Sequence, residues 1–173
     1  MDWPVLLTTS VLFALAFCVV FTAIVVGGVL AAPDAMVHDY PPAIRDRYGP
    51  KSTRGARVAG VMSVLMAALL LGTAVVGVLA LRARLGGDVG FWDGFVFGFV
   101  VFLLGNLFDL VVLDWWLFCT VQPGFLVLPG TEGMAEYADK SFHWKVLVPG
   151  PIFLIPGYGV LGGGTAAVVN VLA

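Results

Sequence analysis

The sequence predicts an all-α protein, an integral membrane four-helix bundle with two structured cytoplasmic loops. The 173-residue chain is 60% hydrophobic and only 12% charged, whereas soluble domains carry about 25% charged residues. Its mean hydropathy is +1.01. Long uncharged runs alternate with short polar segments, as expected for helices that each cross a bilayer. The length suits a single transmembrane domain over residues 1–173.

Four hydrophobic segments predict the membrane spans, at about residues 5–32, 58–81, 93–119 and 148–172. A helix needs about 20 residues to cross the ~30 Å hydrocarbon core, and each segment is long enough. We expect the first segment to be an anchor and not a cleaved signal peptide, because Asp2 precedes it without any Lys or Arg and its apolar run is too long. In the fourth segment, Pro151 suits a first helical turn, and Pro156 predicts a kink.

The charges between these segments predict the orientation. Seven of the nine Lys and Arg residues fall in the first and third connections: Arg45, Arg47, Lys51, Arg54, Arg57, Lys140 and Lys145. The second connection holds only Arg82 and Arg84. Because positive residues concentrate on the cytoplasmic side of membrane proteins, we expect the first and third loops in the cytoplasm and both termini outside.

The third segment carries the most informative residues of the chain. Asp109 and Asp114 interrupt an otherwise hydrophobic run, and Asn106 lies one helical turn before Asp109. A carboxylate inside a bilayer segment is costly and usually faces a protein interior or a watery cavity. The topology brings further polar residues to the same membrane face. We therefore predict a polar, cytoplasm-facing pocket with these candidate residues: Asn106, Asp109, Asp114, His38, Asp39, Glu132 and His143.

Small residues on the same segment predict how it packs. An i+4 stripe runs through Gly90, Gly94, Gly98, Phe102, Asn106, Leu110 and Asp114. Small side chains at this spacing let another helix approach closely. We expect the outer half of the stripe to pack against a neighbouring helix of the same chain and the inner half to face the bundle with polar groups. The glycine run 162–164 either packs tightly or lines a space.

The two larger loops predict short helices. Tyr40, Ile44 and Tyr48 recur at i+4, which favours a short helix lying on the membrane surface. Thr131 precedes a second helical stretch, residues 131–137, and is a suitable N-cap for it.

Three interpretations of the polar residues remain open. His38, Asp109, Asp114 and His143 are the candidate metal ligands, since histidine with carboxylate suits divalent transition metals, although their spacing is not diagnostic. In the structural alternative, Asp109 and Asn106 form hydrogen bonds to neighbouring helices, and Asp114 anchors a loop. A proton or ion path is the third, although the outer halves of the spans are almost wholly apolar. Cofactors and catalytic residues stay unknown.

Several short motifs carry a resemblance to a known group. They are Asn106-Leu107-Phe108-Asp109, Leu113-Asp114-Trp115, Pro129-Gly130-Thr131-Glu132-Gly133 and His38-Asp39-Tyr40-Pro41-Pro42. Together they resemble a group of uncharacterised small bacterial membrane proteins with four predicted spans, over most of the chain. The resemblance implies four helices in a bacterial inner (plasma) membrane and brings no activity.

These observations favour a binding or accessory membrane protein without turnover of its own. The alternative is an enzyme at the membrane surface that acts on a lipid or small apolar substrate, with Asp109 and a histidine as acid–base or metal groups. The expected partners are the lipid bilayer and either a larger membrane complex or further copies of the chain. No basic patch suggests nucleic acid.

Overall fold

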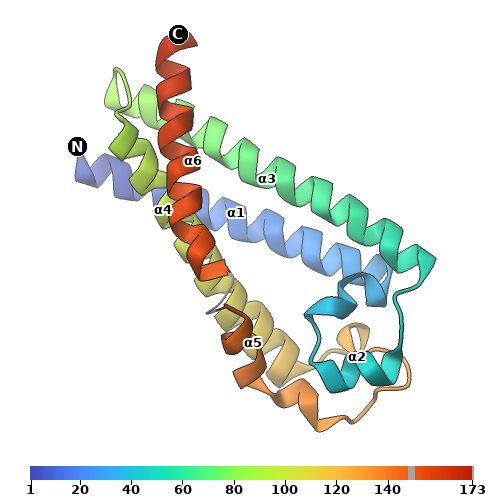
Figure 1. The fold of residues 1–173 in the computed structure, drawn as a ribbon. Coiled ribbons are helices and arrows are strands. Elements are labelled where there is room, and N and C mark those ends of the chain that lie inside the picture. The colour runs from blue at the N-terminus through green and yellow to red at the C-terminus, as the bar shows by residue number, and fades with distance from the viewer. Residues whose placement is uncertain (148–150, 173) are drawn as a thin grey trace.

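A computed structural model describes residues 1–147 and 151–172, and every regular element in this part of the chain is helical. Four helical stretches are long and apolar enough to cross a membrane: Trp3–Ala31, Thr53–Leu85, Phe91–Val121 and Leu154–Leu172. The all-α membrane bundle predicted from composition is thereby confirmed (Figure 1).

The elements follow one another in the order α1 (Trp3–Ala31), η1 (Pro33–Asp39), α2 (Pro42–Tyr48), α3 (Thr53–Leu85), α4 (Phe91–Phe108), η2 (Asp109–Val121), η3 (Gly124–Leu126), η4 (Ala135–Ala138), α5 (Lys140–Leu147) and α6 (Pro151–Leu172). The short elements η1, η3 and η4 are 3₁₀ turns, whereas η2 is a π-helix that continues α4.

Two helix bounds differ from the predicted spans. Helix α3 is longer than residues 58–81 because it continues past the apolar run and includes its flanking arginines. The predicted start of the fourth span, residue 148, lies outside the described residues. Helix α6 begins at Pro151 and contains Pro156.

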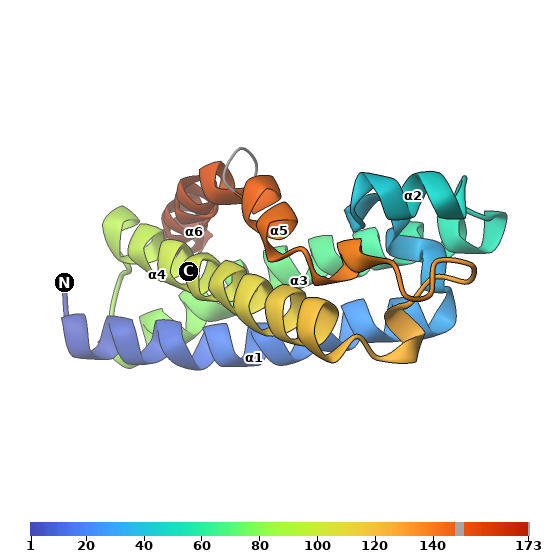
Figure 2. The same ribbon diagram turned by 90° about the horizontal axis from the view of Figure 1, so that it is seen from below.

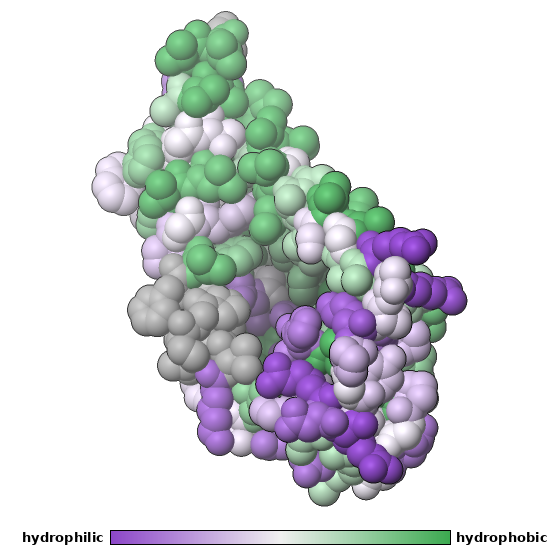
Figure 3. Space-filling view, turned by 45° about the vertical axis from the view of Figure 1, so that its right-hand side comes forward, coloured by the Kyte–Doolittle hydropathy of each residue, from purple (hydrophilic) through white to green (hydrophobic). Residues whose placement is uncertain are grey.

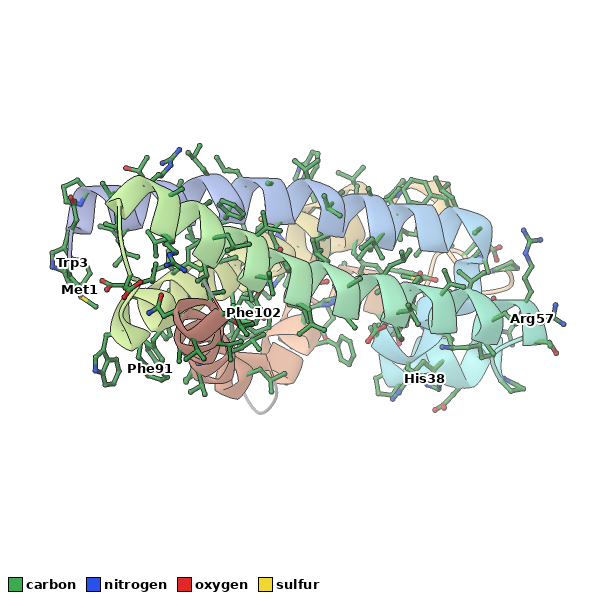
Figure 4. All side chains as sticks on the ribbon, turned by 90° about the horizontal axis from the view of Figure 1, so that it is seen from above. Met1, Trp3, His38, Arg57, Phe91 and Phe102 are labelled. Atoms are coloured by element: carbon green, nitrogen blue, oxygen red, sulfur yellow. The ribbon has the colours of Figure 1, made fainter. Side chains whose placement is uncertain are left out.

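One end of the bundle, here called the terminal end, holds the start of α1, the α3–α4 connection and the end of α6 (Figure 4). Side-chain hydrogen bonds close it. Arg84 donates to Oγ1 of Thr9 at 3.3 Å, and Arg82 donates to the carbonyl of Val169 at 3.2 Å. The Asn170 amide donates to the carbonyl of Val89 at 2.8 Å and accepts from its N–H. The bonds of Arg82 and Asn170 join α6 to the end of α3 and to the α3–α4 connection, and the bond of Arg84 joins α3 to α1.

Helices α4 and α6 lie side by side (Figures 1 and 2), and glycines allow their close contact. A Cβ atom on Gly98 would lie 2.5 Å from the carbonyl oxygen of Tyr158, and one on Gly94 would lie 2.5 Å from that of Gly162. Only glycine permits backbones to approach so closely. The outer half of the predicted stripe therefore packs within the chain, as expected. Gly162 is part of this tight contact, so this glycine of the run 162–164 packs tightly and does not line a space.

The opposite end, here called the loop end, consists of residues 33–52 and 122–147, which pack on each other (Figure 2). The hydroxyl of Tyr40 donates to the carbonyl of Leu126 at 2.8 Å, and that of Tyr137 accepts from the N–H of Leu128 at 2.9 Å. We call the buried side chains here the loop cluster: Val29, Val37, Tyr40, Ile44, Phe118, Cys119, Leu126, Leu128 and Tyr137.

The loop cluster corrects two predictions. Ile44 is 0% exposed, so the apolar face of α2 packs against the protein and not against the membrane surface. An apolar stripe at i+4 spacing suits both a protein surface and a membrane surface, which is why the sequence did not distinguish them. Thr131 is not an N-cap, since its hydroxyl donates to the carbonyl of Leu128 at 2.7 Å and pairs with that of Tyr137. The helical turn begins later, at Ala135.

A buried carboxylate joins the first loop to α3. Asp34 accepts a hydrogen bond from the N–H of Ser52 at 2.6 Å, and the hydroxyl of Ser52 caps α3 by accepting from Gly55 at 2.9 Å. Burial alone would raise the pKa of Asp34, but hydrogen bonds from Ser52, from the backbone N–H of Asp34 and from Tyr48 together outweigh it and lower the pKa below 3.8. Asp34 is therefore held as a carboxylate, which fixes η1 against the start of α3.

Candidate functional site

A cavity of about 280 Å³ opens at the loop end, between α1, η1, the end of α4, η2, η3 and α5. Its apolar wall consists of Phe21, Val25, Val29, Met36, Tyr40, Leu110, Leu113, Phe118, Leu126 and Phe142. Its polar groups belong to His38, Asp39, Asn106, Asp109, Asp114 and His143. Figure 3 shows the wider setting, with hydrophilic residues gathered over the loop end and hydrophobic ones over the rest of this face.

The structure brings together six of the seven residues that the sequence suggests for a pocket. The exception is Glu132, which does not line the cavity. It is exposed, and its carboxylate accepts a hydrogen bond from the N–H of Gly130 at 3.1 Å. Glu132 therefore stabilises a turn between η3 and η4.

The third span changes its helical form where it reaches the cavity. From Asp109 onwards the backbone is a π-helix, in which each N–H bonds to the carbonyl five residues earlier. The last turn shows this spacing, since the N–H of Gln122 donates to the carbonyl of Leu117 at 2.9 Å. Side chains four and five positions apart then share a face, so Asp109, Asp114 and Phe118 all line the cavity. The π-helix is a rare form in proteins.

A carboxylate–histidine pair lies in the cavity wall. Nδ1 of His143 is 3.2 Å from Oδ1 of Asp114. In neutral histidine the nitrogen facing a carboxylate carries the proton, which leaves the other nitrogen with a free lone pair. Nε2 of His143 is that other nitrogen. It is buried and has no hydrogen-bond partner within residues 1–147 and 151–172. A buried polar atom without a partner costs about 1–3 kcal/mol, so this nitrogen is prepared to accept a hydrogen bond.

Within the described residues, Asn106 and Asp109 do not form the interhelical hydrogen bonds of the structural alternative. The amide of Asn106 donates to the carbonyl of Phe102 in its own helix, at 2.8 Å. The carboxylate of Asp109 has no hydrogen-bond partner in the described part of the chain and lines the cavity. Asp114 does anchor the third loop, as that alternative expected, but through His143. Asp109 is therefore free to meet a ligand.

The cavity is acidic. Three carboxylates line it, and the described lining includes neither Lys nor Arg. Asp39 lies where the cavity meets solvent, and its side chain is exposed. The surrounding protein nevertheless removes enough water to raise the pKa of Asp39 above 3.8, and the negative charge of Asp114 acts in the same direction, against an opposing effect of Lys51.

Metal ligation gains no support from this arrangement. Among the described residues, no three or more His, Cys, Asp or Glu side chains lie close enough together to hold a metal ion. The four candidate ligands His38, Asp109, Asp114 and His143 line one cavity without converging on a point. Cys18 and Cys119 are buried free thiols outside the lining.

Sequence reasoning missed the apolar wall. Phe21, Val25 and Val29 recur at i+4 on α1, but in a chain this hydrophobic the same period marks any packed face. Phe142 precedes His143 directly and lies on α5, a short helix that the sequence did not predict.

Comparison of the chain with protein-family models, with curated proteins and with solved structures found no match. The resemblance to small bacterial four-span proteins therefore stays a prediction, and the function has to be inferred from the geometry of the cavity.

Proposed function

We propose that this protein is an integral membrane binding protein whose loop-end cavity holds a small amphipathic molecule. The observation that carries this proposal is an apolar wall combined with two polar groups that have no hydrogen-bond partner among the described residues, the half-buried carboxylate of Asp109 and the buried Nε2 of His143. Ligand sites have this character, with apolar walls for affinity and few polar groups for orientation. The volume lies near the lower end of the usual range, about 300–1,000 Å³, so the ligand is small.

The proposal includes a location. The bias of positive residues supports a cytoplasmic loop end with both termini outside, and the motifs quoted above support a bacterial inner membrane. The ligand then enters from the cytoplasm or from the inner leaflet. An accessory role beside a larger membrane protein, or in an assembly of several copies, fits the exposed apolar side chains of α1 and α3 as well as lipid contact does.

One observation favours a membrane-surface enzyme as the second candidate. The pair of Asp114 and His143 has the geometry of a general base whose tautomer is fixed by a carboxylate. The described lining has no Ser, Thr or Cys, so the base would have to activate water or a hydroxyl of the substrate. Turnover that is lost in His143→Asn would favour this candidate.

The binding proposal is tested with two small amphipathic probes, benzylamine and benzyl alcohol, added to the full-length protein in nanodiscs. A ligand that binds only the folded state raises its stability, by about 2.7 kcal/mol at a hundred times Kd. Leu113→Trp fills the cavity from its wall, and Val111→Trp places the same side chain on the exposed face of the same helix.

We expect at least one probe to raise the unfolding temperature of the wild type and of Val111→Trp, but not of Leu113→Trp. Effects of the probes on the lipid are common to all three proteins and cancel in this comparison. Equal stabilisation of Leu113→Trp, or no stabilisation of the wild type by either probe, would contradict the proposal.

A further inference from the structure

We infer that the ligand of this cavity is a small apolar amine in its protonated form, an organic ammonium ion with at least one N–H group. Its charge is met by Asp109 and Asp114, and its N–H donates to Nε2 of His143. This inference rests on the proposed function and names the class of molecule that the cavity selects.

Charge is the first ground. Asp109 and Asp114 lie on one face of the π-helix, Asp39 lies at the opening, and the described lining contains neither Lys nor Arg; its basic side chains are His38 and His143. Asp114 has His143 as its partner, whereas Asp109 has no hydrogen-bond partner in the described chain. Removing a carboxylate from water without a counter-charge is unfavourable, and a cation in the cavity relieves that cost. Anionic ligands are disfavoured because the carboxylates repel a negative charge.

His143 is the second and independent ground. Its side chain is 8% exposed, and Asp114 occupies Nδ1, so in the neutral imidazole the buried Nε2 is left as an acceptor. An acceptor requires a ligand that donates a hydrogen bond. A protonated primary, secondary or tertiary amine has such an N–H, whereas a quaternary ammonium ion has none. The histidine thereby distinguishes among cations that the carboxylates alone would treat alike.

The apolar walls are the third ground, since they favour an organic cation over an inorganic one. The aromatic rings of Phe21, Phe118 and Phe142 line the same space. Such rings attract a cation electrostatically and also bury an apolar body. An inorganic ion would need several ligands around one point, and the described residues provide no such group.

The experiment compares three probes of similar shape on the full-length protein in nanodiscs: benzylamine, benzyltrimethylammonium and benzyl alcohol. Benzylamine at neutral pH has both the charge and the N–H. Benzyltrimethylammonium has the charge alone, and benzyl alcohol has a donor without charge. The affinity of each is taken from the concentration dependence of the unfolding temperature. We expect benzylamine to bind at least about tenfold more tightly than either of the others, which corresponds to ~1.4 kcal/mol.

Asp109→Asn provides the matched change in the protein, because it removes the charge and keeps the size. We expect it to weaken benzylamine binding about tenfold and to leave benzyl alcohol binding nearly unchanged. Asp46→Asn is the control, since Asp46 is exposed on α2 and outside the cavity lining. It should change neither affinity.

The outcomes separate this inference from the proposed function. Benzyl alcohol binding as tightly as benzylamine would overturn the ammonium inference and leave the binding cavity in place. Equal binding of benzyltrimethylammonium would overturn the role of His143 as acceptor. Failure of all three probes to bind the wild type would overturn the binding proposal itself. The probe series needs no variant, so it decides the question even if Asp109→Asn does not fold.

Discussion

The third membrane span passes through two contrasting environments. Over α4, glycines bring its backbone against α6, and the core around it is apolar: Leu6, Phe17, Ala74, Val78, Leu81, Val89, Phe97, Val101, Tyr158 and Ala166. Over η2 the same span widens into a π-helix, carries two carboxylates and borders a cavity. One continuous helix thus packs tightly against α6 at the terminal end and lines the cavity at the loop end.

The difference shows how a small membrane protein can combine stability with a polar site. Lipid is as apolar as a protein core, so helices in a bilayer gain little from hydrophobicity and depend on close van der Waals contact. The α4–α6 contact has that closeness. The cavity wall at the loop end contains Nε2 of His143, a buried atom without a hydrogen-bond partner among the described residues, and Oδ1 of Asp93 at the start of α4 is a second such atom. Such atoms lower stability, and the close α4–α6 contact helps the fold to tolerate them.

Ile44→Asp should disrupt the loop end while leaving the α4–α6 contact intact. Ile44 is 0% exposed in the loop cluster, and a carboxylate placed there without a counter-charge costs several kcal/mol. We expect a much lower unfolding temperature and rapid tryptic cleavage after Arg45 and Arg47. Ala43→Asp is the control, because Ala43 is exposed on the same helix. If both variants resist trypsin like the wild type, the loop end is not organised around this cluster.

Gly98→Ala should weaken the terminal half, by about 1–3 kcal/mol, the usual cost of overpacking. The added Cβ meets the backbone oxygen of Tyr158, which cannot rotate away as a side chain could. Gly72→Ala is matched to it, since the Cβ there has no atom within 4 Å. It should be neutral or stabilise by up to about 1 kcal/mol, because alanine favours helix over glycine. In thermal unfolding, Gly98→Ala should therefore lower the unfolding temperature, whereas Gly72→Ala should leave it unchanged or raise it. Equal effects would mean that α4 and α6 do not depend on this close approach.

The sequence predicts much of this arrangement because its signals are local or additive. Hydropathy locates the four helices, the i+4 glycines mark the packing face, and the alternating direction of the spans brings His38, Asp39, Asp109 and Asp114 to one end. Two decisive features have no local signal. Asp114 and His143 are far apart in the chain and on different elements, so no spacing reveals their pairing. The change to a π-helix at Asp109 has no signal in the sequence either, since that segment reads as an ordinary apolar helix.

The burial of Ile44 could not be predicted for a related reason. An apolar stripe on a short loop helix fits the membrane surface and a protein surface equally well. The choice depends on where residues 122–139 fold, and their turns place Leu126 and Tyr137 against Tyr40. Glu132 illustrates the reverse case, since the topology brings it to the same end while its backbone turn directs it away from the cavity.

The contrast between a sealed half and an open half is tested by placing one cysteine in each. Leu113 lines the cavity, and Val101, on the same span, is 0% exposed in the terminal core. Leu113→Cys and Val101→Cys are made in a chain with both native cysteines replaced, and each is treated in nanodiscs with 2-aminoethyl methanethiosulfonate. We predict that Leu113→Cys reacts in the folded protein and is protected by benzylamine, whereas Val101→Cys reacts only after unfolding. Equal reactivity at the two positions, or an unreactive Leu113→Cys, would contradict an open cavity at the loop end.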